Sequence, residues 1–247
     1  MLPAMLTTGL DILRILAEAD GPLTATAIAE RVGLHVSNVS RTLRVLAQHG
    51  YVRKPTYHSF APDLGVLCLA GAAAARLPVI RAAAGPVQAL ARRAGMQASL
   101  AALHQEQVVY LHLARPDGAG ATAMAGGFPL HRSVVGLRLL VDLPAKRAVD
   151  LLARSRRTHG WDRPTAATPA DPRACLAAAR SRLRAGVLRT DHWDAPGDAA
   201  LALGLAVAGH PPLALGLDGP AERLPPDHLA ILADAARDLA TALETVP

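Results

Sequence analysis

The clearest hydrophobic pattern in the chain lies between residues 36 and 47. If this stretch is wound at about 100° per residue, its apolar side chains fall on one face of a helix. These side chains are Val36, Val39, Leu43 and Leu46. The opposite face carries Ser37, Ser40, Arg41 and Arg44, and Asn38 flanks it. The pattern predicts an amphipathic helix from Ser37 to Ala47 with a polar face that holds no acid.

A second, shorter pattern precedes this helix. Thr24 is a suitable N-cap for a helix over Ala25–Val32, whose Ile28, Ala29 and Val32 would point inward. Gly33 follows and can turn the chain without a Cβ penalty. Two helices joined by a turn that contains glycine predict a helix-turn-helix.

The residues after the second helix alternate as a β-hairpin does. Tyr51-Val52 predicts a strand, Arg53 to Tyr57 a polar turn, and His58 to Ala61 a returning strand. A hairpin in this place is typical of a winged helix. A first helix, capped by Thr7 or Thr8 and ended by Asp20-Gly21-Pro22, would support the motif from behind. Its expected buried side chains are Leu10, Leu13, Leu16 and Ala17.

Two apolar, alanine-rich segments follow the hairpin. Residues 63–77 predict one helix that ends before Pro78, and residues 79–94 predict a second, which Gly85-Pro86 could kink. An apolar helix between two domains needs a cover. We expect it to come from a second copy of the chain, and burial within its own chain is the alternative.

From Gly95 onward, short strand patterns and helix patterns alternate irregularly. The expected strands are 97–103, 108–114, 187–190, 199–208 and 213–218, and the expected helices are 133–142, 144–153, 174–185 and 226–243. Residues 154–172 are polar and predict a loop. This mixture indicates an α+β domain of the kind that senses small molecules.

The charge of the chain indicates which class of partner it binds. Residues 31–62 contain no Asp or Glu but include Arg31, Arg41, Arg44, Arg53 and Lys54. The formal net charge is +6 over 247 residues. This is the electrostatics of a helix that lies in a groove of double-stranded DNA, where Arg and Asn can read base edges and hydroxyls can meet phosphates. The alternative is a basic amphipathic helix that only faces water.

Other chemistry finds little support in the sequence. Cys68 and Cys175 stand in unrelated contexts, and no Cys or His spacing predicts a metal site or a disulfide framework. The glycines of 118–120 and 126–127 match neither a dinucleotide fingerprint nor a Walker loop, so we expect no cofactor. The N-terminus lacks a signal-peptide pattern and no segment is apolar enough to cross a bilayer, so we expect a cytoplasmic protein without membrane contact.

The residues now described resemble the IclR family of bacterial transcriptional regulators. Gly9-Leu10-Asp11-Ile12-Leu13 is similar to the family's first helix, and Gly33-Leu34 with Ser37, Val39, Arg41 and Leu43 is similar to its recognition helix. The segment Gly127-x-Pro129-Leu130-His131, followed by Gly136, resembles the family's most characteristic C-terminal motif. Gly219-Pro220 resembles a later turn.

The resemblance implies three parts. Residues 1–62 would form a winged helix-turn-helix domain that binds DNA, residues 63–78 a linker helix, and residues 79–247 a GAF-like domain for effector binding and oligomerisation. It implies a homodimer or tetramer on operator DNA that acts as a repressor or an activator. Carried over by position, the DNA contacts would be Ser37, Asn38, Ser40, Arg41 and Arg44 on the helix, and Arg53, Lys54 and Tyr57 at the wing.

The resemblance also implies a pocket for a small-molecule effector, commonly an organic acid or an aromatic compound. Its expected lining is Phe128, Leu130, His131, Leu203, Gly216 and Asp218. Gly216 and Asp218 stand where the family often has hydroxyls, and Leu137 stands where it often has Lys. Asp218 inside a pocket would repel an acid and favour a cation or a hydroxyl donor.

Two interpretations compete with an effector-controlled regulator. One is an enzyme, such as a methyltransferase, that uses its winged helix to dimerise, but the nucleotide-binding glycine loop that it needs is absent from the sequence. The other is a regulator whose C-terminal domain is a scaffold that binds no ligand. His131 near Ser133 suggests a nucleophile pair only weakly, and Trp161 and Trp193 would either shape the pocket or pack in the core.

Overall fold

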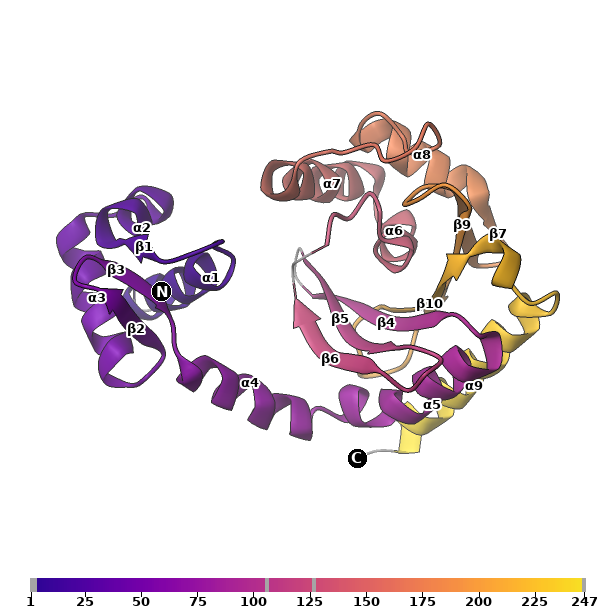
Figure 1. The fold of residues 1–247 in the computed structure, drawn as a ribbon, viewed down its shortest axis with the longest axis horizontal. Coiled ribbons are helices and arrows are strands. Elements are labelled where there is room, and N and C mark those ends of the chain that lie inside the picture. The colour runs from indigo at the N-terminus through magenta and orange to yellow at the C-terminus, as the bar shows by residue number, and fades with distance from the viewer. Residues whose placement is uncertain (1–3, 105–106, 126–127, 246–247) are drawn as a thin grey trace. The chain divides into compact units, whose positions relative to one another are not determined.

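The structure, a computed structural model, describes residues 4–104, 107–125 and 128–245 and divides into two compact units (Figure 1). The first unit ends at Ala75 and the second begins at Arg76. Gly127 of the motif with Pro-Leu-His, and residues 105–106, lie outside the described residues.

The first unit is a helix-turn-helix followed by a wing. Its elements are α1 (Ala4–Ala17), β1 (Leu23–Thr24), α2 (Ala25–Val32), α3 (Val36–Gln48), β2 (Val52–Thr56), β3 (Ser59–Pro62) and α4 (Leu64–Arg76). The three strands form one antiparallel sheet in the order β1-β3-β2. The fold class predicted for this part, a winged helix-turn-helix, is confirmed.

Local chemistry explains the ends of the two motif helices. The Thr24 side chain accepts a hydrogen bond from the Ala27 amide, as an N-cap does, and Gly33 ends α2 in the left-handed conformation at φ 67°. Behind them, Ile12, Ile28 and Leu43 are fully buried and form the core of the unit with their apolar neighbours. The polar face of α3 is thereby held outward from a rigid base.

Three details of this unit differ from the prediction. Helix α1 begins at Ala4, so Thr7 and Thr8 lie within it. Its buried stripe contains Ile12 and Leu16, whereas Leu10 is 56% exposed. Arg53 and Lys54 belong to strand β2, not to the turn, which falls at residues 57–58. Pro55 is tolerated there because β2 is an edge strand whose register shifts between Arg53 and Thr56.

The two alanine-rich helices behave differently. Helix α5 (Pro78–Ala94) buries seven residues, including Val79, Val87 and Leu90, so its apolar face is covered within its own chain. Helix α4 buries none, and its Leu64, Leu67 and Leu69 are each more than 60% exposed. The question of what covers an apolar helix therefore applies to α4 alone.

The second unit is built on one antiparallel sheet of seven strands among the described residues, in the order β6-β5-β4-β10-β9-β8-β7. The strands are β4 (Gln97–His104), β5 (Gln107–Ala114), β6 (Gly120–Ala125), β7 (Leu183–Arg184), β8 (Val187–Asp191), β9 (Asp198–Leu205) and β10 (Leu213–Pro220). The helices are α5, α6 (Val134–Val141), α7 (Ala145–His159), α8 (Pro172–Arg182) and α9 (His228–Thr245), with a short 3-10 turn at Ala221–Arg223.

The helices cover the two faces of this sheet unequally. Helices α5 and α9 pack together on one face, and α6 lies on the other with α7 and α8 behind it (Figure 1). Every residue of α6 is buried, because strands press on one side of it and helices on the other. A mixed α+β sensor-type unit was predicted from the irregular alternation of elements, and this is confirmed.

Some boundaries in this unit were missed by the sequence patterns. Strands β6 and β7 were not predicted, and α7 continues to His159 through residues expected to form a loop. The helix continues because Leu151, Leu152 and Ser155 still face the core while its arginines face solvent. Within the described residues, no single helix is long and apolar enough to span a membrane; α4 and α5 pass that test only as a pair bent by 73°.

We predict that Gly216→Ala destabilises the second unit. A Cβ at this position would lie 2.5 Å from the Cγ1 of Val135 in α6 and 3.1 Å from the carbonyl oxygen of Leu201. Overpacking of this kind costs about 1–3 kcal/mol, to be measured as a loss in the free energy of unfolding by urea.

Adding Val135→Ala to the same chain should recover part of the loss, because it removes the clashing methyl group. Gly85→Ala in α5 is the matched control, since nothing lies within 4 Å of its Cβ and alanine is favoured in a helix. Equal stability of Gly216→Ala and the parent chain would contradict the close approach of α6 to the sheet.

Candidate functional site: a basic helix face and an acidic cavity

The polar face of α3 is open to solvent. Ser37, Asn38, Arg41 and Arg44 are exposed, and Ser40 is half-buried. The predicted apolar face is confirmed at Val39 and Leu43, which are fully buried, but Val36 is 40% exposed because it begins the helix beyond the edge of the core. Thr42 takes its place inward and donates a hydrogen bond to the carbonyl of Asn38.

The cations of this surface have few partners in the protein. Among the described residues, no hydrogen bond or ion pair engages the side chains of Arg41, Arg44 or Arg53. Lys54 lies over the rings of Phe60 and Tyr57, at 5.0 and 5.9 Å from their centroids, and Tyr57 is 84% exposed at the tip of the wing. Because no carboxylate neutralises them, these cations remain free for an anion.

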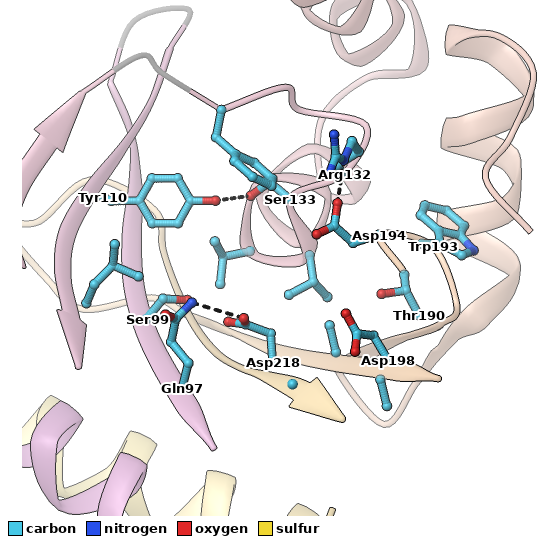
Figure 2. Close-up of a pocket in the computed structure, with 17 residues that line it drawn as sticks. Gln97, Ser99, Tyr110, Arg132, Ser133, Thr190, Trp193, Asp194, Asp198 and Asp218 are labelled. Carbon is cyan, nitrogen blue, oxygen red and sulfur yellow. Dashed lines mark hydrogen bonds and ion pairs between the residues drawn. The ribbon is translucent and has the colours of Figure 1, made fainter. Parts of the chain in front are cut away.

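The second unit contains a cavity of about 480 Å³ beside the N-terminus of α6 (Figure 2). Its floor is formed by neighbouring positions of three strands: Gln97 and Ser99 of β4, Asp218 of β10, and Asp198 and Ala200 of β9. The register pairs Gln97 with Asp218 and Asp218 with Ala200. Cavities of this size commonly hold a small molecule.

The polar groups around the cavity form two hydrogen-bonded pairs. The hydroxyls of Tyr110 and Ser133 lie 2.6 Å apart, and the Ser133 hydroxyl also accepts from the Gly136 amide as the N-cap of α6. The amide of Gln97 donates to Asp218 at 3.0 Å. Burial raises the pKa of Tyr110 to about 12, so its phenol stays neutral.

Asp218 is an unusual acid. Burial raises the pKa of its carboxyl to about 6, the hydrogen bond from Gln97 opposes this shift, and the charges of Asp194 and Asp198 add to it. The carboxyl is therefore mostly ionised at neutral pH, although burial makes its charged form less favourable than it is in water.

An ion-pair network closes the upper side of the cavity. The Nε of Arg132 donates to Asp194, and a terminal nitrogen lies 2.6 Å from a carboxylate oxygen of Asp162; the hydrogen bond to Asp194 raises the pKa of Arg132. The ring of the preceding His131 is fully buried, stacks on Trp161 with centroids 4.1 Å apart, and lies 2.9 Å from the carbonyl oxygen of Asp162. Burial lowers the pKa of His131. Two loops are thereby tied to the segment before α6.

Only part of the expected effector lining surrounds the cavity. Phe128 and Asp218 line it. The other four expected residues do not line this cavity. Leu130 packs in the core, His131 binds the neighbouring loop, and Gly216 lies beneath Val135 of α6. Successive side chains of a strand point to opposite faces of the sheet. Asp198 and Ala200 of β9 face the cavity, so Leu203, like Leu201, lies on the opposite face.

Several lining residues were missed by the sequence reasoning. They are Gln97, Ser99, Tyr110, Leu113, Arg132, Ser133, Val134, Val135, Thr190, Asp194, Asp198, Ala199, Ala200 and Gly219, whereas Trp193, which also lines the cavity, was named as either a pocket or a core residue. A signal existed for Gln97 and Ser99, which are polar residues at spacing two in an otherwise apolar strand. None existed for Asp194, which reaches the cavity from an irregular loop.

Two further kinds of site considered from the sequence are a metal site and a nucleophile pair. Within the part of the chain that the structure describes, no group of three His, Cys, Asp or Glu residues could hold a metal ion. His131 was considered with Ser133 as a nucleophile pair, but its Nε2 faces Asp162 and the Ser133 hydroxyl is shared between Tyr110 and Gly136.

Comparisons with known proteins found matches to both units of the chain. The model of the IclR helix-turn-helix domain matches residues 6–55, and that of the bacterial transcriptional regulator IclR C-terminal domain matches residues 71–245. The Transcriptional repressor IclR of Escherichia coli is 26% identical over 96% of this chain and 89% of its own length. The regulator TsaQ1/TsaQ2 of Comamonas testosteroni is 28% identical over 63% of this chain and 57% of its own length.

Solved structures share the fold. An IclR family regulator from Brucella abortus superposes with a TM-score of 0.76 at 22% identity, covering 100% of this chain and 93% of that chain. An IclR homologue from Microbacterium hydrocarbonoxydans, complexed with 4-hydroxybenzoate, has a TM-score of 0.68 at 22% identity and covers 98% and 99%. With a helix-turn-helix in the first unit, a cavity in the second and family models that match both, the chain belongs to the IclR family of bacterial transcriptional regulators.

Proposed function

We propose that the chain binds an operator sequence in double-stranded DNA through α3 and the wing. The observation that carries this proposal is the exposed, acid-free surface on which Arg41, Arg44 and Arg53 have no partner among the described residues. Guanidiniums on a helix that fits the major groove can bond guanine bidentately, and Asn38 can bond adenine. A partner of this kind places the protein in the cytoplasm.

The wing and the helix serve different roles in this proposal. Lys54 and Arg53 on β2 meet phosphates and set affinity, and Tyr57 extends the wing beside the backbone of the duplex. Ser37 and Ser40 bond phosphates or base edges, whereas Arg41 and Arg44 contribute the choice of sequence.

We further propose that residues 63–78 act as the linker and that α4 within it pairs with a second copy. No residue of α4 is buried, and its exposed Leu64, Leu67 and Leu69 are costly to leave in water. A symmetric pair would present two recognition helices to two half-sites. Residues 79–247 would bind the effector and assist oligomerisation.

An effector bound in the cavity would control DNA binding. An effector that binds more tightly to one arrangement of the assembled copies shifts the population toward it and so changes the spacing of the two recognition helices. The homologue complexed with 4-hydroxybenzoate supports an effector as such.

Substitutions in the basic surface separate its two roles. Arg41→Ala should cost about 1–3 kcal/mol on the preferred operator and relax the sequence preference, because a base contact is lost. Lys54→Ala should weaken binding to all sequences alike and reduce the salt slope by about 1, because one phosphate contact is lost.

An operator selection on random duplexes, followed by titrations at several salt concentrations, measures both effects. Lys146→Ala is the control, because Lys146 is the other lysine of the chain and is exposed on α7 of the second unit. An unchanged sequence preference after Arg41→Ala would exclude this residue from base reading.

Leu67→Glu should weaken self-association. It places a charge on the exposed apolar surface of α4, where a second copy would have to desolvate it. Sedimentation equilibrium should show a monomer at concentrations at which the parent chain is a dimer, and operator binding should fall with it.

Leu229→Glu on α9 is the matched control, since Leu229 is also more than half exposed. If Leu67→Glu and Leu229→Glu leave the assembly equally intact, α4 is not the contact between copies.

A further inference from the structure

The charged side chains that line the cavity are mostly acidic. The carboxylates of Asp194, Asp198 and Asp218 are present with one guanidinium, that of Arg132. Figure 2 shows Asp218 and Asp198 on the strands below and Asp194 on the loop above, with their carboxylates toward the same space. Among the described residues, no cation pairs with the side chains of Asp198 or Asp218.

The one guanidinium among the described residues at the cavity, that of Arg132, is already paired with two carboxylates of the protein. It is bound by Asp194 on one side and by Asp162 at 2.6 Å on the other. These contacts use the Nε and one terminal nitrogen of the guanidinium, so a ligand carboxylate that approached the other terminal nitrogen would still stand near these two carboxylates and near Asp198 and Asp218. Desolvation in a cavity strengthens such repulsion relative to water.

Two hydroxyl side chains at the cavity, on residues that are otherwise buried, add hydrogen-bonding capacity for a polar ligand. Ser99 is 2% exposed and Thr190 is 4% exposed, and both line the cavity. Neither hydroxyl has a hydrogen-bond partner within the described chain. Both hydroxyls are therefore free to donate or accept a hydrogen bond with a group inside the cavity.

The remaining walls are apolar or aromatic. Val134 and Val135 of α6, Leu113 of β5 and the ring of Phe128 line the cavity together with the neutral phenol of Tyr110. Aromatic faces attract a cation as well as an apolar body. The cavity thus offers negative charge at its floor and a hydrophobic surface around it.

We propose that the effector of this protein is a small protonated amine with an apolar or aromatic body, its ammonium group bound between Asp218 and Asp198. The inference rests on the proposed function of the cavity as the effector site and names the chemical class of that effector. It differs from the carboxylate bound by the homologue in complex with 4-hydroxybenzoate.

Matched compounds test the charge preference directly. Tyramine, 2-(4-hydroxyphenyl)ethanol and 3-(4-hydroxyphenyl)propionate share one ring and differ in a positive, neutral or negative end, and larger naphthyl and biphenyl sets extend the size range. Calorimetric titration of the full-length protein at pH 7.5 should rank amine above alcohol above acid, with at least a tenfold gap between amine and acid. An acid that binds more tightly than its matched amine overturns the proposal.

Asp218→Asn is the variant that isolates the carboxylate. Its side-chain oxygen can still accept from Gln97, and the fold loses only a charge that it disfavours. Amine affinity should fall at least tenfold, and acid affinity should rise. Asp238→Asn, at an exposed position of α9, is the control and should change neither. Asp198→Asn provides a second variant with the same expected loss.

The pH dependence of amine binding to the unmodified protein is a further test. The titratable and charged groups around Asp218 are Asp194, Asp198, Tyr110 and Arg132, and its pKa of about 6 lies far below that of an alkylammonium group. Amine affinity should therefore fall as the pH falls from 7.5 to 5, because Asp218 takes up a proton while the amine stays charged. Affinity that stays constant over this range counts against the assignment.

Operator binding without any ligand separates the two proposals. If the protein binds its operator but no amine of the panel binds, the amine proposal fails and the regulator stands. If it binds amines but selects no DNA sequence, the proposed function fails instead.

Discussion

The close approach of α6 to the central strands is the constraint on which the second unit depends. Gly216 of β10 leaves room for Val135, and Gly204 of β9 leaves room for the guanidinium of Arg138, whose Nη2 would lie 2.6 Å from a Cβ at this position. Arg138 is then fixed by the Gly186 carbonyl at 2.8 Å and by Asp142 at 2.5 Å. Because the helix is pinned over these small residues, the space beside its N-terminus, over Asp218 and Ala200, remains open as the cavity.

The same arrangement gives the cavity its electrostatics. The N-cap Ser133 and the following turns of α6 form one wall of the cavity. Arg132, just before the helix, forms ion pairs with Asp194 and Asp162. The arginine thus fastens two loops to the helix while leaving Asp198 and Asp218 without a counter-charge among the described residues. The arginine is thus paired within the fold, and the two acids on β9 and β10 give the floor of the cavity its negative charge.

In the first unit, by contrast, the charged side chains of α3 point outward and are unpaired among the described residues. Ile12, Ile28 and Leu43 anchor α3 from behind, so Arg41 and Arg44 face solvent without a carboxylate nearby in the sequence window 31–62. Such a surface gains little stability from its charges, since exposed arginines contribute almost nothing to folding. Its composition is better explained by an anionic partner than by the fold.

The sequence by itself determined the local elements and the basic surface. Periodicity placed α2, α3 and α9 within a few residues, and the spacing of Thr24 and Gly33 located the turn between the first two, because caps and amphipathic stripes are local properties. The tertiary structure decided the cavity. Gln97, Asp194 and Asp218 meet only because β4 and β10 pair in one register and a loop folds over them, and Leu203 is excluded by the alternation of β9. Contacts between residues more than a hundred positions apart leave no periodic signal in the chain, so they become visible only when the sheet is assembled.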